Sequence, residues 1–320
     1  MAHIEREERG VSRGLGLLAW VTVGWMLLVV LWGAVVRATG SGAGCGDRWP
    51  LCNGDFFPQH PGLATVIEFI HRSTSGICTA LVAALGIWIV FATRRGHPAR
   101  RAWAWTAVLL ITEALLGAVL VLRGYVEGNA SLARVIVQAV HFTNTLMLLG
   151  AMTLTGWFLT RRDASPATGE RRLATVTVVA TLIVGVTGSL AALADTLFPS
   201  SSVVGSLAAD FAASSPWLVR TRWLHPAAAL AVFACAWILG MRVRSAATRT
   251  LRALVLLQLV LGAGDVLLLA PTWMQVLHLL GADLFWMTLV IVWIQSREPL
   301  LATNQRSKIK NHKSYEIGLK

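Results

Sequence analysis

Charged residues are scarce in this chain of 320 residues, where they make up 14% of the sequence. Soluble domains carry about 25%, so this scarcity argues against a water-soluble globular fold. Four cysteines are too few for a secreted scaffold held together by disulfides. The sequence also contains no glycine-rich phosphate loop, nucleophile motif or dinucleotide fingerprint. Hydrophobic residues, in contrast, make up 55% of the chain.

These apolar residues occur in long runs, and about 20 of them in a helix cross a bilayer core of about 30 Å. Membrane barrel strands would instead alternate over about 10 residues. The sequence therefore predicts an all-α polytopic membrane protein with eight transmembrane helices. The predicted spans are residues 15–36, 66–92, 103–122, 135–159, 174–194, 223–241, 251–270 and 272–295.

The net charge is +12, and most basic residues lie in the two tails and in every second connection. The positive-inside rule places such segments in the cytoplasm. Both termini are therefore expected to be cytoplasmic, with the 37–65 and 195–222 connections outside. Because the basic residues do not form one clustered face, we expect a lipid membrane and no nucleic acid as partner.

The two halves of the chain resemble each other weakly, which predicts two tandem, pseudo-symmetric four-helix bundles. The expected parts are an N-terminal half at 1–162, a cytoplasmic linker at 163–172, a C-terminal half at 173–296, and a basic, disordered cytoplasmic tail at 297–320. The matched segments are Gly33-Ala-Val with Gly185-Val-Thr, Glu68-Phe-Ile-His71 with Arg222-Trp-Leu-His225, Leu115-Leu-Gly117-Ala with Val260-Leu-Gly262-Ala, and Gln138-Ala-Val-His141 with Gln275-Val-Leu-His278.

Four histidines lie at a similar expected depth, about 10 Å inside the outer membrane face at 1.5 Å per residue. They are His71, His141, His225 and His278, one in each even-numbered span. A single histidine is ordinarily a hydrogen-bonded interior residue, but ionisable groups in a membrane mark function. Close Cys/His spacings typical of zinc sites are absent. Paired histidines on facing helices suit a haem iron, which predicts two sites: His71 with His141, and His225 with His278.

The two halves differ one turn before the first histidine of each pair. Glu68 shares a helical face with His71, whereas the matching residue of the second half is Arg222. A carboxylate there can act as a base or stabilise charge, and an arginine at the outer edge suits a haem propionate. Catalysis is therefore expected in the first half and a resident cofactor in the second. The alternative is that Glu68 only pairs with Arg72 or Arg37.

Cys45 and Cys52 bracket a short segment of the first outside connection. The oxidising side of the membrane permits a disulfide, with two free thiols as the alternative. Glu113 belongs either to a proton path or to a bond between helices, and its match to Gln258 in the repeat favours the structural interpretation.

Three segments resemble the haem A synthase family: Arg37-Ala-Thr-Gly-Ser-Gly, Trp49-Pro-Leu-Cys52-Asn-Gly, and Glu68-Phe-Ile-His71-Arg72. The resemblance covers about residues 15–295. It implies a membrane enzyme that oxidises a methyl group of haem O to a formyl group by successive hydroxylations, for assembly of terminal oxidases. Arg48 departs from the expected loop, where Asp and Trp-Pro would lie closer together.

The same resemblance implies roles for particular residues. Glu68 would be the catalytic carboxylate, Cys45 and Cys52 a disulfide, His71 and His141 the ligands of substrate haem O, and His225 and His278 the ligands of a resident haem b. A farnesyltransferase that produces haem O would be a partner. The electron acceptor and the oligomeric state, a homo-oligomer included, stay open. Composition and the lack of an organelle presequence favour the bacterial cytoplasmic membrane.

Two other functions stay open at this point. A di-haem b membrane cytochrome for electron transfer would also use paired histidines, but would need neither Glu68 nor the cysteine loop. A haem transporter or delivery protein could also be built on internal repeats, although the parallel repeats expected here differ from the inverted repeats of many transporters.

Overall fold

The computed structural model describes residues 2–161, 170–243 and 245–296, and in this part of the chain the long elements are all helices. Eight of them are long and apolar enough to cross a membrane, which confirms the eight predicted spans. The helices are α1 (Ala2–Ala38), α2 (Leu63–Ala92), α3 (Pro98–Leu122), α4 (Leu132–Thr160), α5 (Arg171–Leu197), α7 (Leu224–Arg242), α8 (Ala246–Leu267) and α9 (Thr272–Ser296), with a shorter α6 (Val203–Phe211).

Large apolar side chains cover much of the outer surface of the bundle. Phe91 is 85% exposed and Val260 68% exposed, and Trp105 is exposed to a similar degree. In water such a surface would be costly, whereas lipid solvates it. The chain is therefore a multi-pass membrane protein.

Local signals in the sequence account for several helix ends. The Ser131 hydroxyl accepts a hydrogen bond from the Arg134 amide at 3.3 Å and caps α4. The prediction that the seventh span continues to residue 270 is wrong, because α8 ends at Leu267. Leu269 and Ala270 adopt positive φ angles of 61° and 53°, and the following Pro271 disfavours helical backbone in the residue before it.

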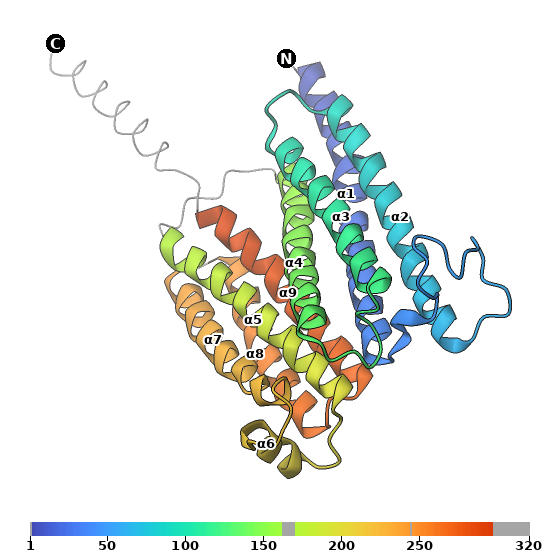
Figure 1. Ribbon diagram of the computed structural model, residues 1–320. Helices are drawn as coiled ribbons and strands as arrows, with labels where there is room; N and C mark the ends of the chain where they lie inside the picture. Colours follow the sequence, from blue (N-terminus) through green and yellow to red (C-terminus); the bar gives the residue numbers. More distant parts are fainter. Residues whose placement is uncertain (1, 162–169, 244, 297–320) are drawn as a thin grey trace.

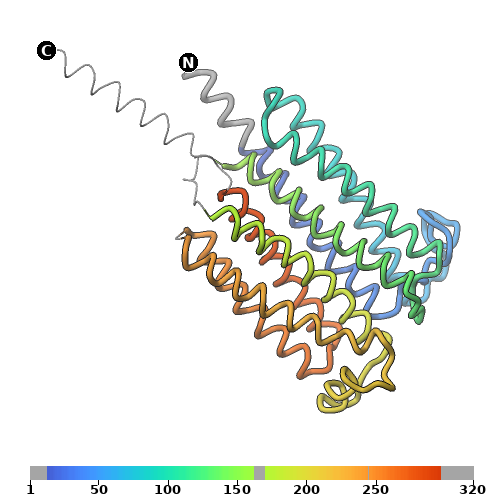
Figure 2. Tube along the Cα trace, turned by 60° about the vertical axis from the view of Figure 1, so that its left-hand side comes forward, coloured from blue at the N-terminus to red at the C-terminus, as the bar shows by residue number. Residues whose placement is uncertain are grey.

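The helices form two groups that pack side by side (Figures 1 and 2). In the first group α1 packs on α2 and α4, and α3 packs on α4; in the second, α5 packs on α7 and α9, and α8 packs on α9. Helices α1 and α4 meet α5 and α9 between the groups. The buried Trp286 indole of α9 donates to the Leu146 carbonyl oxygen of α4 at 2.6 Å. One apolar core therefore continues from group to group.

The predicted division into halves stays a prediction. Residues 162–169, which make up most of the expected linker, and the expected tail at 297–320 lie outside the described residues.

Helix α1 begins and α9 ends at one end of the bundle, while connections 39–62 and 198–223 lie at the other, here called the loop end (Figure 1). Helix α6 lies in the second of these connections. This helix was not predicted from the sequence.

Candidate functional site

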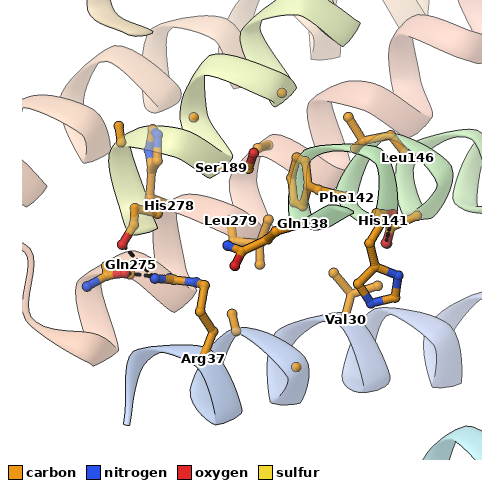
Figure 3. A pocket seen from close by; sticks show the side chains of 18 of the residues that line it. Val30, Arg37, Gln138, His141, Phe142, Leu146, Ser189, Gln275, His278 and Leu279 are labelled. Atoms are coloured by element: carbon orange, nitrogen blue, oxygen red, sulfur yellow. Dashed lines mark hydrogen bonds between the residues drawn. The ribbon is translucent and has the colours of Figure 1, made fainter. Parts of the chain in front are cut away.

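A single cavity of about 1060 Å³ opens between the two groups of helices, with walls from both. Pockets for small molecules range over about 300–1,000 Å³, so this one is large. All four predicted histidines line it, and so does Glu68. Gln138, Phe142 and Leu279 lie between His141 and His278 in the view of Figure 3. The structure thus brings together residues that the sequence spreads over four helices.

Each of the four histidine rings packs against a glycine of the preceding span. A Cβ atom added to the glycine would lie at the following distance from the ring: Gly33, 3.1 Å from His71; Gly117, 3.9 Å from His141; Gly188, 2.9 Å from His225; and Gly262, 3.2 Å from His278. A larger residue at the closest of these positions would push the ring out of place.

These contacts correct one part of the predicted repeat. Gly33 was matched to Gly185, but Gly185 lies against Phe142 and the Leu146 side chain. Gly188, about one helical turn later, is the residue that contacts His225. The sequence match was misled by a similar tripeptide, since only the contact with the ring identifies the equivalent glycine.

The His225 and His278 rings have the spacing of two axial ligands. Their centroids are 6.1 Å apart and their planes are nearly perpendicular, at 84°. Two imidazoles on opposite sides of one iron have centroids about 6 Å apart, because each metal–nitrogen bond is about 2 Å. The Nδ1 atom of His278 is buried without a hydrogen-bond partner, as are those of His71 and His141. The spacing of this pair is therefore compatible with one iron bound by both rings.

Glu68 is buried, at 3% exposure, and both of its carboxylate oxygens have partners. Oε1 accepts from the Arg72 guanidinium, with Nη2 at 2.6 Å and Nε at 3.1 Å. Oε2 accepts from the backbone amide of Cys45 at 2.7 Å. The predicted alternative of a pair with Arg72 is therefore present in the structure, whereas the side chain of Arg37 bonds elsewhere. The carboxylate still forms part of the cavity wall, but in a fixed position.

The cysteine loop and Glu68 form one unit. Cys45 and Cys52 are joined by a disulfide. Arg72 Nη1 donates to the carbonyl oxygens of Arg48 at 2.8 Å and Leu51 at 2.7 Å, so the residue that binds Glu68 also holds the loop. Any movement of the loop would therefore be felt at the carboxylate.

Arg222, predicted to bind a propionate, is neutralised by two carboxylates. Its Nη1 lies 2.8 Å from Asp195, and its Nε lies 2.7 Å from Asp210 of α6. Its Nη2 lies 2.6 Å from Asp210 and also donates to the Ser206 carbonyl oxygen at 2.9 Å. The sequence did not reveal this network, because Asp195 lies in α5 and Asp210 in α6, a helix that was not predicted.

Two other arginines line the cavity, and within the described part of the chain neither has a carboxylate partner. Arg37 donates to the Thr196 hydroxyl at 2.7 Å and to Gln275 Oε1 at 2.6 Å (Figure 3). Arg134, at 3% exposure, donates to the Glu127 and Asn129 carbonyl oxygens, and its Nε has no partner. Arg134 is thus held by neutral groups. Asp195 and Asp265 are close enough to act on the charge of Arg37, but neither forms an ion pair with it. For Arg134 the sequence held a signal, since it lies on the helical face of His141, two turns earlier.

The chain is similar to known proteins over most of its length. The sequence model of the COX15-CtaA family, described as cytochrome oxidase assembly protein, matches residues 16–290. The chain belongs to this family. Heme A synthase of Bacillus pumilus is 33% identical over 243 residues, which cover 70% of this chain and 72% of the relative. Heme A synthase of Alkalihalophilus pseudofirmus is 35% identical over 144 residues, covering 45% and 46%.

A further relative of this COX15-CtaA member carries a different name. Protoheme IX farnesyltransferase of Thermus thermophilus is 40% identical over 285 residues, which cover 86% of this chain and 47% of the relative. The chain thus spans about half the length of the Thermus relatives that it matches.

Proposed function

We propose that this protein is a haem A synthase, which oxidises a methyl group of haem O to the formyl group of haem A by successive hydroxylations. One observation carries the proposal: a single cavity is lined by two histidine pairs, and a buried carboxylate lies three residues before the first histidine of one pair only. Family membership and the two relatives named Heme A synthase support it.

We assign His71 and His141 to the iron of substrate haem O, and His225 and His278 to a resident haem b. The 6.1 Å centroid spacing of the second pair supports its assignment. When bound, haem b supplies one-electron redox chemistry, which the side chains lack. The glycine beside each histidine leaves room for the imidazole.

Glu68 is the catalytic carboxylate of this proposal. In an apolar cavity its charge would stabilise a positive charge developing at the oxidised carbon, or it would accept a proton from a water that attacks that carbon. Arg72 and the Cys45 amide hold the carboxylate in place, so little reorganisation is needed during the reaction. The apolar walls exclude bulk water, which strengthens this electrostatic effect.

Arg134 and Arg37 are better placed than Arg222 to bind haem propionates. Guanidinium groups bind carboxylates through charge-assisted, often bidentate hydrogen bonds. A propionate approaching Arg222 would have to compete with Asp195 and Asp210, whereas Arg134 and Arg37 form hydrogen bonds to neutral groups and no ion pair. In this proposal Arg222 acts indirectly, by holding α6 at the loop end.

A farnesyltransferase is the proposed source of the substrate. The Thermus relatives are named for the farnesylation of protoheme IX, a reaction that gives haem its long isoprenoid tail. That tail is apolar, so transfer within the membrane spares it from contact with water. A shared membrane location of the two activities would therefore help the substrate reach this cavity.

The proposal is tested by analysing the haems of cells and purified protein that carry Glu68→Gln. We expect haem A to fall by about a hundredfold or more while haem O or a hydroxylated intermediate accumulates. Asp55→Asn is the matched control, because Asp55 is an exposed carboxylate in the connection that precedes α2. Unchanged haem A in Glu68→Gln would refute the assignment. Only haem b in the wild-type protein, with no haem A formed, would favour the di-haem cytochrome instead.

A further inference from the structure

A second carboxylate faces one of the four histidines. Oε2 of Glu113, on α3, lies 3.5 Å from Nδ1 of His141 on α4. The carboxylate is fixed from α4, where the Asn144 amide donates to Oε2 at 2.6 Å and the Thr145 hydroxyl donates to Oε1. Thr112 in turn bonds to Asn144 at 2.8 Å. The position of this negative group beside the ring is therefore set by neighbouring side chains on both helices.

The second half has no such carboxylate among its described residues. Gln258 occupies the matching sequence position, and its amide donates to the His278 backbone carbonyl oxygen at 3.1 Å. Among the described residues no carboxylate forms an ion pair with the His278 ring, and the Nδ1 atom of His225 faces the neutral Thr187 hydroxyl at 3.5 Å. The two histidine pairs thus differ by one charge next to a ring.

We propose that Glu113 is a positioning residue, which acts through His141 to make the reduction potential of the first iron lower than that of the second. The inference rests on the haem ligation proposed above. A carboxylate beside Nδ1 favours the tautomer that carries its proton there, leaving Nε2 free for the iron, and makes the imidazole a stronger electron donor. A stronger donor stabilises the ferric over the ferrous iron. Neutral Gln258 has no comparable effect on His278.

The difference gives electron transfer a direction. The iron held by His71 and His141 would lose one electron and the iron held by His225 and His278 would gain it, with no bond made or broken. The lower potential at the first site favours this transfer, so electrons leave the substrate site for the resident haem. The repeat thus differs at this position, Glu113 in one half and Gln258 in the other, and this difference would give the two irons different reduction potentials.

The test is a redox titration of the full-length protein carrying haem B in both sites, followed by visible absorption. His141→Ala and His278→Ala each remove one haem and so assign the two potentials. Glu113→Gln keeps the size of the side chain and a carbonyl oxygen for one of the two donors, Asn144 and Thr145, but removes the charge. We expect it to shift the first iron's reduction equilibrium toward the ferrous state by about tenfold, or about 59 mV.

The reciprocal change, Gln258→Glu, is the matched variant of the second half. It should lower the second potential by a similar amount and leave the first unchanged. Unshifted potentials in Glu113→Gln, with both haems bound, would overturn the inference. Should Glu113→Gln fail to bind haem, Gln258→Glu decides, since a lowered second potential supports the inference and an unchanged one overturns it. If neither histidine variant loses a haem, the proposed ligation itself is wrong, and the inference falls with it.

Discussion

Replacing Gly188 by alanine should weaken haem binding at the second site without unfolding the bundle. The new Cβ would lie 2.9 Å from Cε1 and 3.1 Å from Nδ1 of His225. Ordinary van der Waals contact begins near 3.4 Å, so the ring must retreat by about 0.5 Å. His225 would then no longer hold its place opposite His278.

Two energies set the expected result, the cost of crowding the His225 ring and the helix preference for alanine over glycine. Overpacking a close-packed interior costs about 1–3 kcal/mol, and each 1.4 kcal/mol is a factor of ten in affinity. Haem binding at this site should therefore weaken by about 5- to 150-fold. Alanine is also favoured over glycine inside a helix by about 1 kcal/mol. Helix α5 itself should therefore be no less stable.

The assay is haem content per protein, measured together with the unfolding temperature in detergent. Gly117→Ala is the matched control, since its Cβ would lie 3.9 Å from the His141 ring, in ordinary contact. It should retain both haems. Wild-type haem affinity in Gly188→Ala, or an equal loss in Gly117→Ala, would refute the argument from ring contacts.

Two further substitutions probe the first half. Cys52→Ser removes the disulfide that holds the Cys45 amide against Glu68. Haem A production should therefore fall about tenfold or more, while the haem content of the protein stays the same. An unchanged rate of haem A formation would contradict the coupling between the loop and Glu68. Arg134→Gln removes charge-assisted hydrogen bonds worth about 1.5–3 kcal/mol, so haem titrations should show about 10- to 100-fold weaker binding at the first site. Arg123→Gln, a change at an exposed arginine, is the control and should bind haem as the wild type does. Equal haem affinities in the two variants would argue against a propionate at Arg134.

Hydropathy was sufficient to predict the eight spans, because a helix that crosses lipid must satisfy its own backbone and present apolar side chains. The exact ends of the helices were less predictable from hydropathy. Helix α8 ends before residue 270, because Leu269 and Ala270 adopt left-handed backbone ahead of Pro271. Helix α6 is short and lies in a connection rather than in lipid, so hydropathy does not reveal it.

The four histidines could be recognised from sequence because each interrupts an apolar span at a similar distance from its end. The residues that surround the histidines in the folded protein could not be recognised from the sequence. Arg222 looked like a free cation, but folding brings Asp195 and Asp210 to it from two other segments. Arg134, in contrast, is left with neutral partners in the cavity wall. Whether a charge is available for a ligand depends on what packs around it.

By itself, then, the sequence determined the membrane class of the protein and its eight spans, and it singled out the four histidines that we propose as iron ligands, since these follow from composition and position along one helix. The tertiary structure alone decided that the four histidines share one cavity, that a glycine stands behind each ring, and that only His141 has a carboxylate beside it among the described residues. Those relations join helices far apart in the chain. They depend on distances of a few ångströms across the bundle, and spacing along the sequence carries no information about such distances.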